Sequence, residues 1–179
     1  MQISVATSVR CARLSDTSAV TDLVNRAFAI ERFFFDGDRT TSDEIERLIR
    51  AGWFLVVEAS PGLCATVLFQ GPGQRAGLPP SHAYFGMLSV LPEVQRSGLG
   101  RQLVQLVEAK AAQAGATAMH LRVINLREEL SRWYNSLGYR EVGITPYNHV
   151  SLKRPCHFIE MTKPLAPAGD RAGAESGAA

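Results

Sequence analysis

The chain has 179 residues, 46% of them hydrophobic and 20% charged, with a formal net charge of +2. This composition predicts a folded core of ordinary size, and so small a charge argues against nucleic acid as a partner. Cys11, Cys64 and Cys156 form no metal-ligand or disulfide pattern, so we expect reduced thiols, no metal and a cytoplasmic protein. No apolar run approaches the roughly 18 residues of a membrane span and the start lacks a secretory signal, so no membrane association is expected.

The first part of the chain combines strand and helix patterns. Asp-Thr-Ser at 16–18 can cap a helix whose apolar residues recur at helical spacing. Thr41-Ser42-Asp43-Glu44 is a capping box that begins a second helix, and Gly52 ends it. Apolar and turn residues predict three strands, at Val9–Leu14, Trp53–Ala59 and Leu63–Gln70, the last two joined as a hairpin.

The second part alternates between strands and helices. After a loop rich in Gly and Pro, Gly71–Ser81, the apolar strand His82–Val90 is predicted to be central in a sheet because both of its faces are apolar. The later elements are predicted as helix Leu99–Ala114, strand Ala118–Ile124, helix Leu126–Leu137, and strands Tyr139–Ile144 and Cys156–Thr162 around the loop Thr145–Pro155.

The order β-α-α-β-β-β-α-β-α-β-β predicts an α/β fold. We expect a mixed sheet of about seven strands with helices on both faces and a parallel crossover around the central strand. The expected domain covers residues 8–164. A tail at 165–179, composed of small and polar residues, is expected to be disordered.

A glycine-rich turn, Gln95-Arg96-Ser97-Gly98-Leu99-Gly100-Arg101, connects the central strand to the following helix. Such a turn leaves backbone N–H groups without an intrachain partner, and together with the helix dipole and two arginines these favour a phosphate-bearing ligand. The alternative is that the turn only closes a strand–helix corner. The Lys-Ser/Thr pair of a P-loop is missing, and so is the third glycine of a dinucleotide-binding fingerprint, because position 103 is Leu.

Two segments carry a family resemblance. Residues 88–100, from Leu-Ser-Val to Gly-Leu-Gly, resemble the acetyl-CoA signature of the GCN5-related N-acetyltransferase (GNAT) superfamily, and Trp133-Tyr134 through Gly138-Tyr139 is similar to its second signature. The resemblance covers about residues 8–164. It implies that the turn binds the pyrophosphate of acetyl-CoA and that the central strand pairs with pantetheine. The cofactor-binding residues it implies are Leu88, Ser89, Val90, Gln95, Arg96, Ser97, Gly98, Leu99, Gly100, Arg101 and Asn125.

The resemblance also implies a catalytic residue. The family's tyrosine at the position of Tyr134 protonates the departing thiolate, and a phenol with a pKa of about 10 can donate at neutral pH. The alternative is that Tyr134 only packs on its helix. A backbone N–H near Val90 could bind the oxyanion. Asn125 either contacts pantetheine or, with Glu128, caps the next helix; many relatives have the asparagine seven positions before the tyrosine, whereas here it stands nine before it.

No pattern identifies the general base. The candidates are His82, His120, His149, His157 and Glu58, and a water relay is equally compatible. The resemblance places the connection between the first two helices beside the acceptor, where aromatic residues next to carboxylates suit an amine with an apolar body; the phenylalanines can equally anchor the loop on the core. The predicted substrate-binding residues are Phe33, Phe34, Asp36, Tyr147 and His149.

The resulting prediction is an acetyl-CoA-dependent N-acetyltransferase that acetylates a primary amine of a small molecule. Two alternatives stay open: an enzyme that acetylates proteins or peptides, and a non-catalytic regulatory module that binds acyl-CoA. The expected partners are acetyl-CoA and an amine, and the expected state is a monomer or homodimer.

Overall fold

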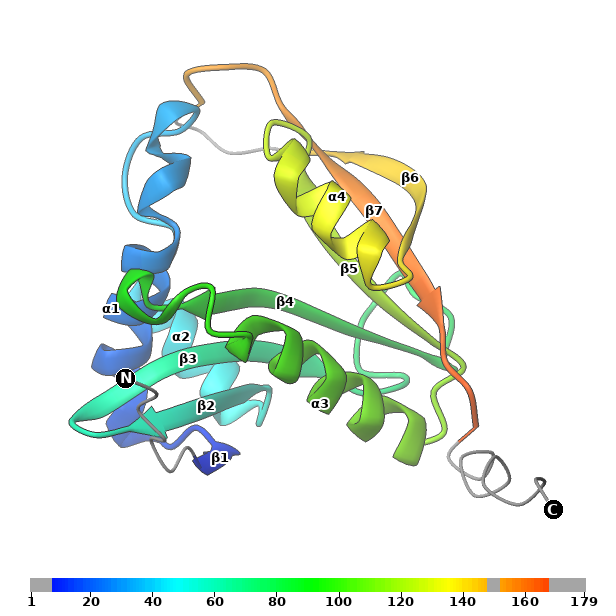
Figure 1. Cartoon of the computed structure of the whole chain (residues 1–179), viewed down its shortest axis with the longest axis horizontal. Helices are drawn as coiled ribbons and strands as arrows, with labels where there is room; N and C mark the ends of the chain where they lie inside the picture. Colours follow the sequence, from blue (N-terminus) through cyan, green and yellow to red (C-terminus); the bar gives the residue numbers. More distant parts are fainter. Residues whose placement is uncertain (1–7, 148–151, 168–179) are drawn as a thin grey trace, which may run out of the picture. The chain divides into compact units, whose positions relative to one another are not determined.

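A computed structural model describes residues 8–147 and 152–167. Its strands are β1 (Ser8–Cys11), β2 (Phe54–Ala59), β3 (Gly62–Gln70), β4 (His82–Val90), β5 (Ala118–Ile124), β6 (Arg140–Pro146) and β7 (His157–Pro164). Its helices are α1 (Thr17–Ala27), α2 (Ser42–Arg50), α3 (Leu99–Gln113) and α4 (Glu128–Ser136) (Figure 1). The seven strands form one sheet in the order β1-β2-β3-β4-β5-β7-β6. The predicted α/β class, strand number and element order are therefore confirmed.

The chain divides into two compact units, and β4 and α3 each contribute residues to both. In the first unit, residues 8–69 and 86–103 together with 147 and 152–156, β2 pairs antiparallel with both β1 and β3. Helices α1 and α2 pack together, and Val20, Val24 and Ile45 are fully buried. The helical spacing of these apolar residues explains why each helix has one buried face.

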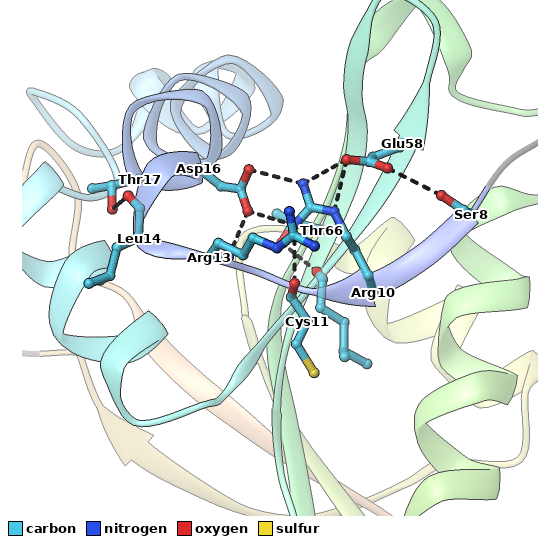
Figure 2. Close-up of polar contacts among 10 residues, drawn as sticks. Ser8, Arg10, Cys11, Arg13, Leu14, Asp16, Thr17, Glu58 and Thr66 are labelled. Atoms are coloured by element: carbon cyan, nitrogen blue, oxygen red, sulfur yellow. Dashed lines mark hydrogen bonds and ion pairs between the residues drawn. The ribbon is translucent and has the colours of Figure 1, made fainter.

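A group of ionic contacts fixes β1 to its neighbours in the first unit. Figure 2 shows the Arg10 guanidinium between the carboxylates of Asp16 and Glu58. Two nitrogens bind Asp16 at 2.7 and 3.0 Å, and Nε binds Glu58 at 2.8 Å. Asp16 also accepts the backbone N–H of Arg13 at 2.6 Å. The planar guanidinium can bind both carboxylates at once, so a single residue joins β1, β2 and the start of α1.

In the second unit, residues 70–85, 104–146 and 157–167, β5 lies between β4 and β7. His82–Tyr84 pairs parallel with Ala118–His120, which confirms the predicted crossover, and β7 pairs antiparallel with both β5 and β6. Helix α4 contacts β5 (Figure 1). In the described part of the chain, no helix combines the length and apolarity required to cross a membrane.

Some predicted boundaries differ from the structure. The predicted strand Val9–Leu14 ends at Cys11, and residues 14–16 form a short 3-10 helix. The last helix begins at Glu128, with Arg127 at its N-cap. Leu165, predicted to begin the tail, donates its N–H to Thr117 at 2.9 Å; the rest of the predicted tail, from 168, lies outside the described residues.

Candidate functional site

The glycine-rich turn of the first unit presents unpaired backbone donors, as its sequence predicts. Gln102 N–H begins the α3 hydrogen-bond pattern by donating to Gly98 at 3.1 Å. Within the described residues, the N–H groups of Arg96, Ser97, Gly98, Gly100 and Arg101 have no acceptor, and both arginine side chains are exposed and form no ion pair. These N–H groups stand at the N-terminus of a 15-residue helix, so the turn fits the pyrophosphate of a coenzyme A ester.

The turn keeps its shape through left-handed backbone and local side-chain contacts. Arg96 has φ +66° and Gly98 has φ +86°, a conformation that glycine adopts without strain. The Gln95 side chain donates to the Val90 carbonyl at 3.0 Å, and the Ser97 hydroxyl donates to Val94 at 2.7 Å. Gln95 and Ser97, predicted to bind the cofactor, therefore also hold the loop against the end of β4.

Strand β4 has an irregular backbone before it reaches the turn. Met87 has φ +47°, which is unusual for a residue with a side chain and marks local strain inside a strand. Leu88 and Val90 are half-buried, whereas Ser89 is buried and its hydroxyl donates to the Met87 carbonyl at 3.0 Å. The Ser89 hydroxyl is therefore occupied within the strand, and the pairing of the Leu88–Val90 backbone with pantetheine stays a prediction.

Tyr134 is the buried phenol of α4 in the second unit. Its ring centroid lies 5.9 Å from that of Phe85 and 4.7 Å from that of Trp133. Burial raises its pKa above the ordinary value for a tyrosine. Its hydroxyl has no hydrogen-bond partner among the described residues. Among the described residues, the fully buried side-chain oxygens without a partner belong to Ser131 and Thr145, so the Tyr134 oxygen keeps some exposure to solvent. Because its pKa is raised, the phenol is protonated at neutral pH.

The second tyrosine of the motif has a different environment. Tyr139 is fully buried, and its hydroxyl donates to Glu108 Oε1 of α3 at 2.8 Å. Lys163 Nζ of β7 binds the two oxygens of Glu108 at 2.9 and 2.8 Å. Since its hydroxyl is occupied, Tyr139 is unsuited to donate a proton to a ligand. Nothing in the sequence pattern joins these three residues, because their contact depends on the packing of α3 against β7.

Asn125 connects two strands instead of capping α4. Its side-chain oxygen accepts the His157 N–H at 2.9 Å, and its own N–H donates to the His157 carbonyl at 3.0 Å. The predicted capping box with Glu128 is wrong, because the N-cap is Arg127 and makes no side-chain cap. The side-chain nitrogen of Asn125 has no partner among the described residues, so a side-chain contact with acyl-CoA would use that donor.

The structure limits the candidates for general base. Glu58 binds Arg10, which lowers the pKa of its carboxyl, so it is a weak base. His82 Nδ1 and His120 Nε2 lie 2.8 Å apart. Burial and then His82 lower the pKa of His120, which keeps it neutral at pH 7 but occupied by its partner. His149 lies outside the described residues.

Predicted substrate-binding residues meet in the first unit. The ring of Phe34 lies edge-on to that of Tyr147, with centroids 6.4 Å apart, and Lys153 binds Asp36 at 2.7 Å. Phe34 is fully buried, whereas Phe33 is 43% exposed. Phe34 therefore anchors the loop on the core, and of the two only Phe33 offers a surface to a ligand.

Sequence reasoning missed the buried acid Glu31. It lies in the short 3-10 helix Ala29–Phe33 and is 4% exposed. It contributes to raising the pKa of Tyr147 and of Cys156, after burial as the main cause. No motif surrounds this residue in the sequence, so only the fold identifies it. Across the described residues, no group of three or more His, Cys, Asp or Glu side chains is arranged to hold a metal ion.

Comparison with solved structures supports the same fold. The ribosomal-protein-S18-alanine N-acetyltransferase of Escherichia coli is 17% identical, with a TM-score of 0.70 over 92% of this chain and 97% of that chain. The putative acetyltransferase yncA of Salmonella typhimurium, solved with acetyl-CoA, is 21% identical, with a TM-score of 0.70 over 89% and 94%. An N-acetyltransferase of Staphylococcus aureus Mu50 is 15% identical, with a TM-score of 0.72 over 89% and 99%. No curated protein matches the chain.

A sequence model of one family matches residues 20–139, a segment that includes the glycine-rich turn and Tyr134. It is the model of the acetyltransferase (GNAT) family. The match spans most of the chain and contains both segments that carry the resemblance. The chain therefore belongs to the acetyltransferase (GNAT) family.

Proposed function

We propose that this protein is an acetyl-CoA-dependent N-acetyltransferase that acetylates a primary amine of a small molecule, with Tyr134 as the general acid. The observation that carries the proposal is the Tyr134 phenol, which is buried, protonated and without a partner among the described residues. Membership of the family and the unpaired N–H groups of the turn support acetyl-CoA as the donor.

Each group has one role in this proposal. Acetyl-CoA supplies the acetyl group as a thioester, whose sulfur departs as a thiolate. The N–H groups at 96–101 and the side chains of Arg96 and Arg101 hold its pyrophosphate. The amine nitrogen bonds to the acetyl carbon as the carbon–sulfur bond breaks, and the Tyr134 oxygen gives its proton to the departing sulfur. The amine loses its extra proton to solvent or a base, and solvent returns a proton to Tyr134. The raised pKa of Tyr134 keeps this acid loaded up to alkaline pH.

The phenol hydroxyl can be tested by removing it alone. In Tyr134→Phe we expect kcat to fall by about 10²–10⁴-fold, while the Kd for acetyl-CoA stays unchanged because the turn is intact. Thr66→Val is a matched control, since it removes another buried hydroxyl, one that donates to Leu55 at 2.7 Å in the first unit. Release of free thiol with saturating acceptor is the measurement. Unchanged turnover in Tyr134→Phe would exclude Tyr134 as the acid.

A screen of amines and peptides separates the alternatives. Thiol release with small primary amines supports the proposal, and release with peptides alone supports a protein acetyltransferase. Tight binding of acetyl-CoA without thiol release for any acceptor supports a regulatory module. The unpaired phenol favours an enzyme, because a binding module has no use for a buried proton donor.

A further inference from the structure

A polar face lies in the second unit on the side of the sheet opposite α4. Successive residues of a strand point to opposite faces, so Tyr84 points away from Phe85, which contacts Tyr134 of α4. Arg122 and Glu160 are direct partners in the β5–β7 register, as are His120 and Thr162. The polar face, defined in this way, comprises His82, Tyr84, His120, Arg122, Glu160 and Thr162.

The β3–β4 connection places a guanidinium on this face. The Arg75 Cζ lies 3.5 Å from the centroid of the Tyr84 ring, which is a close stacking contact. One nitrogen donates to the Gln70 side-chain oxygen at 3.0 Å. Arg75 is half-buried, and burial is the main cause that lowers its pKa. A guanidinium has five N–H donors, so stacking and a single hydrogen bond orient this group and leave most of its donors available.

Arg75 forms no ion pair among the described residues. The acid nearest in the strand register, Glu160, is bound to Arg122 at 2.7 Å. His120 stays neutral at pH 7, because burial and His82 hold its pKa below its ordinary value. Since Arg122 and Glu160 neutralise each other, Arg75 adds a positive charge in a partly desolvated position where a cation is costly unless an anion joins it.

The stacked arginine belongs to the part of the second unit that contains the proposed acid. Tyr84 is the neighbour of Phe85 in β4, and the Phe85 ring lies 5.9 Å from that of Tyr134. Tyr84 is close enough to contribute to raising the pKa of Tyr134, after burial. The pairing of β4 with β5 covers His82–Tyr84, although both strands continue beyond it. Tyr84 thus stands at the end of this pairing, with Arg75 on one side and the residue that contacts Tyr134 on the other.

We propose that the guanidinium of Arg75, held flat on Tyr84, binds a carboxylate of the acceptor, so that the acceptor is an amine that also carries a carboxylate. This inference rests on the proposed function and adds the substrate class. A planar guanidinium edge matches a carboxylate in two parallel hydrogen bonds. The positive charge of Arg75, next to the neutral Arg122–Glu160 pair, balances a single negative charge on the ligand. The Glu160 carboxylate disfavours a dianion such as phosphate.

Matched acceptors test the carboxylate directly. Acetyl transfer is measured with a panel of α-amino acids and with the corresponding α-amino-acid amides, in which the carboxylate is a neutral carboxamide. For wild-type protein we expect the larger kcat/KM with the acids. In Arg75→Gln the ratio of kcat/KM, acid over amide, falls by about 10–100-fold, the loss typical of a charged hydrogen bond. Arg75→Lys keeps the charge but loses the planar edge, so its acid-over-amide ratio lies between those of wild type and Arg75→Gln. The KM for acetyl-CoA stays unchanged in both variants.

A ratio measured on one protein separates recognition from folding, since a merely structural role of Arg75 lowers both rates together. Arg47→Gln is the control, because Arg47 is an exposed arginine of α2 in the first unit; its ratio stays at the wild-type value. An unchanged ratio in Arg75→Gln, or a wild-type enzyme that prefers amines without a carboxylate, overturns the proposal.

A binding measurement distinguishes this proposal from the proposed function. Protein saturated with CoA is titrated calorimetrically with each acid and its amide, which requires no catalysis. If wild-type protein transfers no acetyl group but binds acids in preference to amides, and Arg75→Gln loses the preference, the proposed function fails and the carboxylate site stands. Absence of this preference in both transfer and binding overturns the carboxylate site.

Discussion

The ring of Tyr139 meets the ring of Tyr134 edge-on, with centroids 5.8 Å apart. Phe85 completes the cluster at 5.9 Å from each of them. The Tyr139 hydroxyl is bound by Glu108 at 2.8 Å, and Glu108 is bound in turn by Lys163. The proposed acid therefore packs against a ring that is fixed at its far end by a half-buried ion pair, so Tyr139 is well placed to position Tyr134.

The Tyr139→Phe variant tests this positioning role. It keeps the ring and removes the hydroxyl that anchors it to Glu108. We expect kcat to fall by about tenfold, because a small displacement of a reacting group slows catalysis strongly. The KM for acetyl-CoA stays unchanged, since the turn belongs to the other unit. Tyr139→Leu, which also removes the ring, should lower kcat further. A fall in thermal stability with kcat unchanged in both variants would assign Tyr139 a structural role alone.

Gly98 carries a separate prediction for the turn. A Cβ added to Gly98 would meet no atom within 4 Å, so there is room for a side chain. Glycine is favoured here because the backbone has φ +86°, in the left-handed region. Gly98→Ala adds about 1–2 kcal/mol of strain to the left-handed conformation, and relief of that strain turns N–H groups away from the ligand. We expect the Kd for acetyl-CoA, measured by calorimetry, to rise about tenfold. Gly62→Ala is the control, as Gly62 also has open space but no left-handed backbone; an equal effect in both variants would contradict the argument.

The sequence predicts those features of this protein that depend on local pattern. Apolar periodicity is sufficient to predict the helices that carry Val20 and Ile45. The two glycines, together with the apolar strand before them, predict the turn at 95–101. The unpaired N–H groups follow from the turn type, because a helix cannot satisfy its first donors internally.

Contacts that depend on tertiary structure are not predictable in this way. Asn125 has the spacing of a helix cap, yet the arrival of β7 supplies the His157 N–H as a competing donor. β1 ends at Cys11 because Asp16 binds both Arg10 and the backbone of Arg13, which turns the chain. Arg75 lies in a loop rich in Gly and Pro with no motif of its own, so its stacking on Tyr84 appears only in the fold.

The Arg10 contacts predict a specific dependence of stability on pH. Hydrogen bonding to Arg10 is the main cause that lowers the pKa of both Asp16 and Glu58. Groups with a lowered pKa stabilise the fold above their unfolded pKa of about 4, and this contribution is lost as the pH falls through their folded pKa. Arg10→Lys keeps one charge but cannot reach both carboxylates, so we expect Tm at pH 7 to fall by about 2–4 °C, with the difference narrowing as the pH falls.

Calorimetric melting at several pH values measures this effect. Arg50→Lys is the matched control, because Arg50 binds Glu46 at 2.6 Å in an exposed pair within α2. Exposed pairs contribute little, so Tm should stay nearly unchanged. Equal falls in Tm for Arg10→Lys and Arg50→Lys would show that the contact of Arg10 with two carboxylates stabilises the fold no more than an exposed ion pair does.

The histidine pair predicts a second, separate pH window. In the unfolded chain His120 titrates near 6.5; in the folded chain burial first and His82 second lower its pKa, and Glu160 opposes them. At a pH between the folded and the unfolded pKa of His120, the unfolded state binds more protons than the folded state. The free energy of unfolding therefore falls as the pH decreases below about 6.5, and His120 does not affect it above that pH. In His120→Gln this dependence should disappear between pH 7.5 and 5, as measured by urea unfolding. His157→Gln is the control, since it replaces another half-buried histidine of the second unit that lies outside the pair. Since Asp16 and Glu58 titrate at lower pH, a wild-type slope in His120→Gln within this window would show that another group is responsible.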